Sequence, residues 1–241
     1  YVVSAARSAL AGEIAAMVTL PMNKEATQLT DPSFTGHTEL IASECGVKGA
    51  VLMLASDRLI VTHVSTHCSL RQAIERAVRE RVLRVIRLTC DAVRRLGHEP
   101  RVAVAGLNPH AGENGLFGRE EIEEIAPAVA QARAEGLPVE GPLPPDTTFY
   151  LAVERGRFAA VVCMYHDQGH IPLKLLDFEG GVNVTLGLPI IRTSVDHGTA
   201  FDIVGKGIAD PGSLLEAIKL AATIAATRVS RSRWRQEAPS S

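Results

Sequence analysis

The chain has 241 residues, of which 46% are hydrophobic and 22% charged, and its formal net charge is −2. A chain of this size and composition can bury a full core as a globular protein, in one large domain or two small ones. The small net charge and the aromatic content of 4% argue against a nucleic-acid-binding surface. No apolar run approaches the roughly 20 residues that span a bilayer, so we expect no membrane partner.

The cysteine pattern and the start of the chain bear on its compartment and completeness. The cysteines are widely spaced and form no C-x-x-C pair, so disulfides are not expected. With no signal peptide recognised, we expect a cytoplasmic location. The chain opens at Tyr1, without a methionine and directly in a helix-like segment, so we expect that an N-terminal portion is missing. The cysteines are Cys45, Cys68, Cys90 and Cys163.

Strand-like and helix-like segments alternate along the chain, which predicts an α/β architecture. A helix is expected over residues 2–11 and a buried strand over residues 14–20. A loop with the sequence PMNKEA follows, and the segment GHTEL begins a short helix that continues to Cys45. Two strands, over residues 51–56 and 59–66, are then expected to form a hairpin.

The longest predicted helix covers residues 70–96. Ser69 is suited to cap it, with Gln72 at the capping-box position, and Gly97 follows its end. The second half of the chain continues the alternation, with Pro127 expected to kink its first helix. Its elements are a strand over 101–107, a helix over 120–135, an extended loop over 141–145, a short helix from Asp146 to Gly156, strands over 159–165, 181–188 and 190–195, and a helix over 212–227.

Three of the apolar runs are followed at once by a histidine. The runs LIVTHVSTH, RVAVAGLNPH and AAVVCMYH end on His67, His110 and His166. In open α/β sheets, ligands bind beyond the carboxyl ends of the strands. Three imidazoles are also a common ligand set of a catalytic metal ion. The pattern therefore predicts convergence on one metal, although a single histidine after a strand is more often an ordinary loop residue.

Other polar residues lie near these histidines in the sequence. Asp146 and Asp167 could each ligate a metal, orient an imidazole or act as a general base, and Asp146 could instead cap a helix. His63 lies within a strand pattern and is expected to be structural, while the role of His170 stays open.

Cationic and polar residues also occur in apolar surroundings. Lys174, Asn183 and Arg192 follow His166 in the chain, and Arg192 lies in the run PIIRTSV. An unpaired buried guanidinium is costly, so Arg192 needs an anionic partner, either a protein carboxylate or a ligand. No G-x-G-x-x-G or Walker sequence is present, so an ordinary Rossmann or P-loop interpretation has no support.

Several longer motifs resemble a known enzyme family. GHTE, NPHAGE, GPLPPDT, MYHDQGHIPLK and GVNVTLGLPIIRTSVDHGTA are similar to motifs of the 4-hydroxythreonine-4-phosphate dehydrogenase family, PdxA, of pyridoxal phosphate biosynthesis. DHGTAFDIVGKGIADP also resembles the nucleotide loop of isopropylmalate and isocitrate dehydrogenases. The resemblance implies their α/β fold, with mixed sheets flanked by helices and two subdomains that enclose the active site in a cleft.

The resemblance also implies residue roles. The metal ligands fall on the same three histidines, and the family shares this metal site between the subunits of a homodimer. Asp167, Asp146 or Lys24 would act as the base. Substrate contacts fall on His37, Thr38, Lys174, Asn183 and Arg192. Contacts to the adenosine part of NAD fall on His197, Gly198, Thr199, Ala200 and Asp202.

The activity that the resemblance implies depends on NAD and on one divalent metal (Zn, Co, Ni, Fe, Mn or Mg). It is oxidation of 4-phosphooxy-L-threonine to a β-keto acid that decarboxylates. Alternatives are a dehydrogenase of 4-phospho-D-erythronate, 4-phosphothreonate or a cis-dihydrodiol, a metal-dependent hydrolase or lyase without NAD, and an inactive dimeric fragment that binds metal and phosphate.

Two departures from the family pattern qualify this interpretation. The family's N-terminal portion, with its GDPAGIGPE-like motif, is absent, which puts NAD binding in question. Asn23 stands where some biosynthetic members have histidine, as in relatives that act on phosphoerythronate or phosphothreonate. We expect a central substrate, metal and dimerisation subdomain over about 20–150, the remaining nucleotide-binding subdomain over about 1–19 and 151–228, and a loose tail over 229–241.

Overall fold

The computed structural model describes residues 1–227 of the chain. It divides into two compact units, one formed by Val51–Leu186 and the other by the segments before and after it. This division differs from the expected one, because residues 20–50 group with the N-terminal segment and residues 151–186 group with the central unit. The predicted tail over 229–241 lies outside the described residues.

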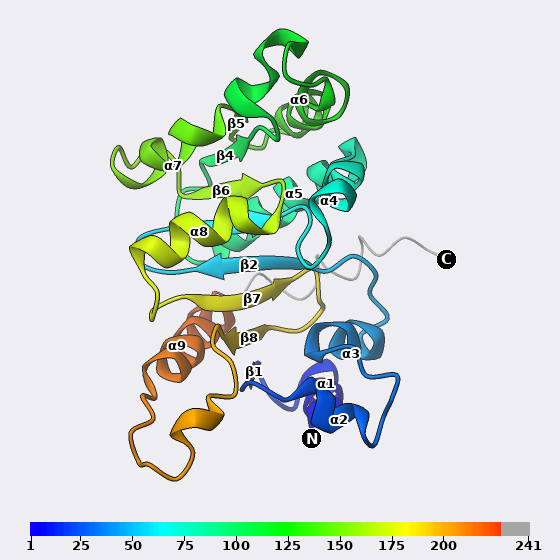
Figure 1. Cartoon of the computed structure of the whole chain (residues 1–241), viewed down its shortest axis with the longest axis vertical. Coiled ribbons are helices and arrows are strands. Elements are labelled where there is room, and N and C mark those ends of the chain that lie inside the picture. Colours follow the sequence, from blue (N-terminus) through cyan, green and yellow to red (C-terminus); the bar gives the residue numbers. More distant parts are fainter. Residues whose placement is uncertain (228–241) are drawn as a thin grey trace. The chain divides into compact units, whose positions relative to one another are not determined.

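The central unit is built on a mixed sheet (Figure 1). Its strands lie in the order β7-β2-β3-β6-β4-β5. β2 runs antiparallel to β3 and β7, whereas β3, β6, β4 and β5 are parallel to one another. The strands are β2 (Val51–Ala55), β3 (Ile60–His63), β4 (Val102–Ala105), β5 (Val139–Leu143), β6 (Ala160–Cys163) and β7 (Val182–Leu186). The expected hairpin of residues 51–66 is confirmed by the β2–β3 pair.

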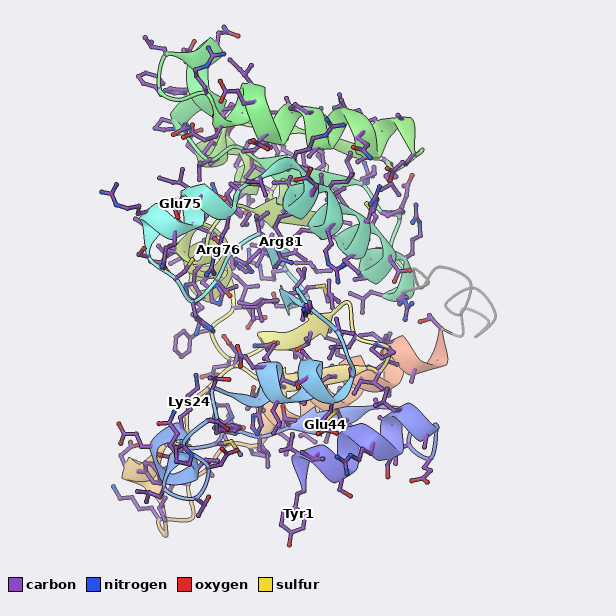
Figure 2. The ribbon with its side chains drawn as sticks, turned by 90° about the vertical axis from the view of Figure 1, so that its right-hand side faces the viewer. Tyr1, Lys24, Glu44, Glu75, Arg76 and Arg81 are labelled. Carbon is purple, nitrogen blue, oxygen red and sulfur yellow. The ribbon has the colours of Figure 1, made fainter. Side chains whose placement is uncertain are left out.

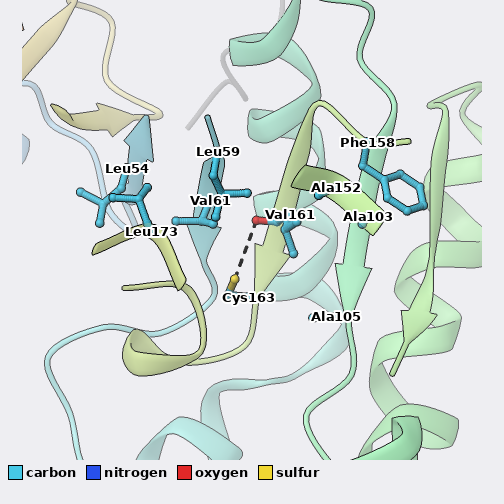
Figure 3. Packing of buried hydrophobic residues seen from close by; sticks show 10 residues of the cluster. All are labelled: Leu54, Leu59, Val61, Ala103, Ala105, Ala152, Phe158, Val161, Cys163 and Leu173. Carbon is cyan, nitrogen blue, oxygen red and sulfur yellow. Dashed lines mark hydrogen bonds between the residues drawn. The ribbon is translucent and has the colours of Figure 1, made fainter. Parts of the chain in front are cut away.

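Helices cover both faces of this sheet. Alternate residues of β3 point to opposite faces, so Thr62 bonds the hydroxyl of Thr89 on α5 at 2.7 Å while Val61 joins the core on the other side. The core on the Val61 side of the sheet also includes Val161 and Leu173, which Figure 3 shows. α7 and α8 pack over this side. The helices are α4 (Leu70–Arg76), α5 (Arg79–Arg95), α6 (Ala126–Ala134), α7 (Pro145–Val153) and α8 (His166–Leu176).

The helix predicted over residues 70–96 is in fact two helices. The capping box of Ser69 and Gln72 is present at the start of α4 as expected. Val78 is extended, however, with φ −87° and ψ 153°. The amide of Arg79, at the start of α5, donates to the Glu124 carboxylate at 2.6 Å. A side chain 45 residues away thus caps a new helix start, which no local pattern could indicate.

Three further differences concern the segments that carry polar residues. The helix expected over 120–135 begins as the π-helical segment η2 (Glu121–Ile125), and α6 takes over next to Pro127. The stretch expected as an extended loop over 141–145 contributes to β5, an edge strand where Pro142 is tolerated. The cluster after residue 165, expected as a loop, forms the first turns of α8.

The other unit contains a short parallel pair of strands, β1 (Met17–Thr19) and β8 (Arg192–Val195). Met17 packs with Ile41 and Ile190 in its core. α9 closes against β8, where the Thr193 hydroxyl donates to the carbonyl of Ala217 at 2.8 Å. The remaining elements are α1 (Val2–Ala11), α2 (Lys24–Gln28), α3 (His37–Glu44), η3 (Phe201–Ile203) and α9 (Gly212–Ala226).

The structure also bears on the predictions about cysteines and membranes. All four cysteines are free thiols, as expected. Within the described part of the chain, every helix is too short or too polar to cross a bilayer.

Candidate functional site

The ends of β3 and β6 bring two of the predicted histidines together. Parallel pairing continues past both strands, with the amide of Val64 bonded to Cys163 O at 2.8 Å and that of Ser65 to Met164 O at 3.2 Å. The residues that follow therefore leave the sheet side by side. The rings of His67 and His166 lie with their centroids 5.6 Å apart.

These two histidines line a pocket of about 250 Å³. His166 is the first residue of α8, and its Nδ1 lies 2.7 Å from the Asp167 carboxylate. Because a carboxylate only accepts, Nδ1 carries the proton and Nε2 keeps its lone pair, the form in which an imidazole binds a metal ion. The pocket is lined by Thr66, His67, Cys68, Leu70, Ala73, Tyr165, His166 and Asp167.

His110 does not join this pair within one chain. It lies in η1 (Pro109–Gly115), where five successive residues from His110 to Asn114 have positive φ values between 43° and 83°. Its ring is near Phe117, at 6.2 Å between centroids. Among residues 1–227, no group of three His, Cys, Asp or Glu side chains is placed to hold a metal ion. One chain thus presents two of the three predicted ligands, and the complete set stays a prediction.

A buried carboxylate holds the beginning of the His110 loop. Glu121, 2% exposed, accepts hydrogen bonds from the amides of Leu107 and Asn108, both at 2.7 Å, and from Asn108 Nδ2 at 2.9 Å. A Cβ on Gly112 would lie 2.7 Å from Glu121 Oε2, so the loop also needs glycine there. Sequence reasoning missed Glu121, because nothing in REEIEEI distinguishes it from the other glutamates of this run, which are less buried.

Two other side chains tie the strand ends. Gln168, 7% exposed, donates to Gly106 O after β4 at 2.7 Å and accepts from the amide of Met164 after β6 at 2.6 Å. Arg81, labelled in Figure 2, donates from α5 to Val64 O after β3 at 2.9 Å. The ends of three parallel strands are therefore held by side chains of fixed position, which suits a preorganised site.

A second pair of histidines lies beneath the first. His63 is fully buried, as expected for a structural residue, and its Nε2 is 3.1 Å from Nδ1 of His170. Burial, with a smaller contribution from the nearby His170, lowers the pKa of His63 to about 3. His170 was left open by the sequence; its position four residues after His166 on one helix is the signal that could have linked the two.

The unit formed by the segments before and after Val51–Leu186 contains a separate cationic group. Arg192 is 4% exposed, and its Nε and Nη2 donate to the Thr19 hydroxyl at 3.1 and 2.7 Å. Burial lowers the pKa of Arg192 to about 10 while Glu39 opposes the shift, so the guanidinium stays charged at neutral pH. Burial and then the charge of Arg192 lower the pKa of His37. An anion bound here would favour the charged forms of Arg192 and His37 and so raise the pKa of both side chains.

The predicted substrate residue Thr38 and the candidate base Lys24 belong to the same unit. Thr38 follows His37 in the first turn of α3. Lys24, labelled in Figure 2, starts α2, and its Nζ lies 3.6 Å from the place where a Cβ of Gly36 would be. Asn23 caps the same helix by accepting from the amide of Ala26 at 2.8 Å. The asparagine that departs from the family pattern therefore has a structural use.

Lys174 and Asn183 belong to the central unit. The ammonium of Lys174 lies 5.4 Å from the centre of the Phe178 ring. The Asn183 Oδ1 atom is buried, and within the described part of the chain it accepts no hydrogen bond. An unsatisfied buried acceptor is costly, so a donor from a ligand would stabilise this side chain.

The remaining predicted site residues are exposed, except for Thr199, which is half-buried. Asp146 lies in the first turn of α7, but the N-cap is Pro144, so the interpretation of Asp146 as a helix cap was wrong. Thr148 bonds the carbonyl of Pro144 instead. The predicted nucleotide residues occupy the turn before and within η3, with Nδ1 of His197 2.9 Å from the carbonyl of Gly198. They are His197, Gly198, Thr199, Ala200 and Asp202.

The buried His63 makes stability depend on pH. Its folded pKa of about 3 lies below the ordinary value of 6.5, so between these values the unfolded chain binds a proton that the folded chain does not. The contribution of His63 to the free energy of unfolding is complete above pH 6.5. It falls by about 1.4 kcal/mol per pH unit as the pH decreases toward 3. We expect the stability advantage of the wild type over His63→Gln to shrink by about 2–3 kcal/mol between pH 7 and 4.5.

Urea unfolding of the metal-free protein at several pH values measures this difference. His98→Gln is the matched control, because His98 is exposed and its replacement should leave the wild-type pH dependence intact. A difference between wild type and His63→Gln that does not change with pH would contradict the prediction.

Comparison with known proteins identifies the family. The profile described as pyridoxal phosphate biosynthetic protein PdxA matches residues 1–221. The chain is 52% identical over 224 residues to a 4-hydroxythreonine-4-phosphate dehydrogenase of Desulforapulum autotrophicum, covering 92% of this chain and 66% of that protein. It is 52% identical over 218 residues to the D-threonate 4-phosphate dehydrogenase of Salmonella typhimurium, covering 90% and 66%. The chain thus spans about two thirds of the length of these relatives.

Solved structures agree with this assignment and with the predicted fold. A 4-hydroxythreonine-4-phosphate dehydrogenase from Klebsiella pneumoniae superposes with a TM-score of 0.83 at 51% identity, over 93% of this chain and 69% of that one. An isocitrate dehydrogenase from Methylococcus capsulatus, 14% identical, shares the fold with a TM-score of 0.51 over 86% of this chain and 68% of that one. The isocitrate dehydrogenase-like α/β fold expected from the sequence is confirmed, and the chain belongs to the PdxA family.

Proposed function

We propose that this chain carries the chemistry of an NAD-dependent and divalent-metal-dependent dehydrogenase that oxidises a CH–OH group of a phosphorylated hydroxy acid. The observation that carries the proposal is the pair of His67 and His166 at adjacent strand ends, with Nδ1 of His166 bound to Asp167. The names of the relatives support two substrates, 4-phosphooxy-L-threonine and D-threonate 4-phosphate. Oxidation of the first, in pyridoxal phosphate biosynthesis, is the reaction we propose.

Different residues would bind the metal, accept the proton and contact the nucleotide. His67, His166 and His110 would hold a divalent cation, which supplies Lewis-acid polarisation of the substrate hydroxyl. Asp167, Asp146 or Lys24 would accept the proton from the hydroxyl oxygen. NAD, when bound, would supply the acceptor for the hydride of the carbon that bears this oxygen, and the β-keto acid product could then decarboxylate. His197, Gly198, Thr199, Ala200 and Asp202 would contact the nucleotide.

Recognition of the substrate anion falls to the buried cationic group. Arg192 is held by Thr19, and with His37 and Thr38 it would bind the phosphate. Lys174 would add positive charge, and Asn183 offers an acceptor to a hydroxyl or ammonium donor. A guanidinium that is already fixed and desolvated binds a phosphate strongly, because little side-chain freedom is lost.

The reaction is tested by NADH absorbance with the purified chain and NAD, with and without added divalent metal. The substrates are 4-phosphooxy-L-threonine, D-threonate 4-phosphate, 4-phospho-D-erythronate and a cis-dihydrodiol. We expect metal-dependent NADH formation from one of the phosphorylated acids. Metal binding without NADH from any substrate would favour the inactive-fragment alternative, and turnover of a substrate without NAD would favour a hydrolase or lyase.

We also propose a homodimer in which residues of two subunits complete the metal site. Within one chain His67 and His166 are adjacent, whereas His110 lies apart on its left-handed loop. Mixing His110→Ala chains with His166→Ala chains should then restore a full ligand set in one of the two centres of a mixed dimer. We expect about one metal ion per mixed dimer and almost none in either parent dimer.

Metal content of tagged and separated mixed dimers, measured by atomic absorption, checks this expectation. Mixing two preparations of His110→Ala that carry different tags is the control for exchange alone. Mixed dimers as empty as their parents would show that His110 and His166 ligate from the same subunit, and wild-type metal content in the His110→Ala dimer would remove His110 from the ligand set.

Replacement of Arg192 by methionine tests the phosphate site while keeping a long buried side chain. A charge-assisted hydrogen bond contributes about 1.5–3 kcal/mol, so we expect KM for the phosphorylated substrate to rise about 10- to 100-fold. kcat should change much less, because the phosphate is bound equally in ground and transition states.

Steady-state kinetics measure both constants, and Arg7→Met provides the control. Arg7 is an exposed arginine of the same unit that pairs with Glu44, so its loss should leave KM unchanged. An unchanged KM for Arg192→Met together with a large loss of stability would make Arg192 a structural cation.

A further inference from the structure

A chain of hydrogen bonds runs from the sheet to the candidate metal ligand. Nδ1 of His63 lies 3.4 Å from the carbonyl of Leu52 on β2, and its Nε2 lies 3.1 Å from Nδ1 of His170. Nδ1 of His170 also lies 3.0 Å from the carbonyl of His166. The rings of His170 and His166 stack, with centroids 3.5 Å apart and planes 11° from parallel.

The partners determine where the protons lie. The Leu52 carbonyl only accepts, so Nδ1 of His63 carries the proton; a fully buried imidazole is held neutral, and Nε2 is then a bare acceptor. Nδ1 of His170 faces that acceptor and the His166 carbonyl, so it must be a donor. The tautomers of both buried histidines are thereby set by the backbone of β2 and α8.

The close packing of α8 against His63 requires a glycine at position 169. A Cβ on Gly169 would lie 2.5 Å from Nε2 of His63 and 2.9 Å from Sγ of Cys163. Glycine therefore lets α8 approach the strands closely enough for His170 to reach His63. His170 is 7% exposed, whereas the side chain of His166 is 36% exposed and depends on its neighbours for a fixed orientation.

We propose that His63 and His170 are positioning residues that fix the ring plane of His166. Asp167 sets the tautomer of His166 from the solvent side, and the ring of His170 supports its buried face. This inference rests on the proposed function, because it concerns the use of His166 as a metal ligand. Residues that orient a ligand in this way typically change metal affinity by about 10- to 100-fold when they are replaced.

Two substitutions at His63 separate positioning from simple core packing. His63→Leu fills the space but offers His170 no acceptor, and we expect it to weaken Zn²⁺ affinity about 10- to 100-fold. His63→Gln offers Oε1 to Nδ1 of His170, and we expect it to restore affinity to within about threefold of wild type. Competition between the dimeric protein and a chelator of known affinity measures these values.

Val61→Ala is the matched control, because Val61 is fully buried on the same face of β3 but contacts the core and not His170. It should lower stability without weakening Zn²⁺ binding. Equal affinities for wild type, His63→Leu and Val61→Ala would overturn the proposal, as would a loss of affinity in His63→Leu that His63→Gln does not recover.

Imidazole nitrogen NMR of the metal-free dimer tests the same inference without the metal. In the wild type we expect Nδ1 of His170 and Nδ1 of His166 to be protonated and Nε2 of His63 bare, each as a single tautomer. In His63→Leu the ring nitrogen signals of His166 should shift and broaden, because its ring loses the fixed stack on His170 while Asp167 still accepts from Nδ1. If the wild type binds no metal, the proposed function fails while this measurement still decides the positioning role; a His166 spectrum unchanged in His63→Leu overturns it.

Discussion

The parallel pairing of β6 with both β3 and β4 determines where the chemistry of this chain can lie. Parallel strands end at the same edge of a sheet, so the residues that follow them meet there. Continued pairing of Val64 and Ser65 with β6 then carries His67 to the side of His166. Gln168 from α8 and Glu121 from η2 fix the same edge, so polar side chains hold the loops where backbone pairing ends. Because the site is assembled at strand ends, it inherits the rigidity of the buried sheet.

The sequence predicted the part of this site that follows from strand order. An apolar run followed by histidine indicates a strand end, and two of the three histidines meet as that pattern predicts. His110 differs because its loop follows a left-handed path, held by a carboxylate that lies outside the motif and carries no local signal. A distant carboxylate also explains why the predicted long helix is divided, because Glu124 caps the start of α5 from another segment of the chain. Long-range hydrogen bonds of this kind can be found only once the chain is folded.

Arg192 shows how far chemical reasoning from residue type can go. A guanidinium within an apolar run needs a partner, which the sequence indicates, but the hydroxyl that orients it belongs to Thr19, 173 residues earlier. Thr19 and Arg192 meet because β1 pairs with β8, a contact between the two ends of the unit. The Thr19 hydroxyl holds the buried guanidinium in a fixed orientation, and a planar fork of donors held in this way suits the recognition of a phosphate.

The groups that orient His170 from the buried side suit a place beside a bound cation. The carbonyl of His166 and the buried neutral imidazole of His63 both accept from its Nδ1. Neither of these two partners adds a charge next to the ring that stacks on His166. The carboxylate of Asp167 contacts His166 on the exposed side, where it strengthens the ligand through Nδ1. His170 supports one face of the His166 ring, whereas Asp167 supplies charge at the ring edge, so each can be altered by a substitution that leaves the other in place.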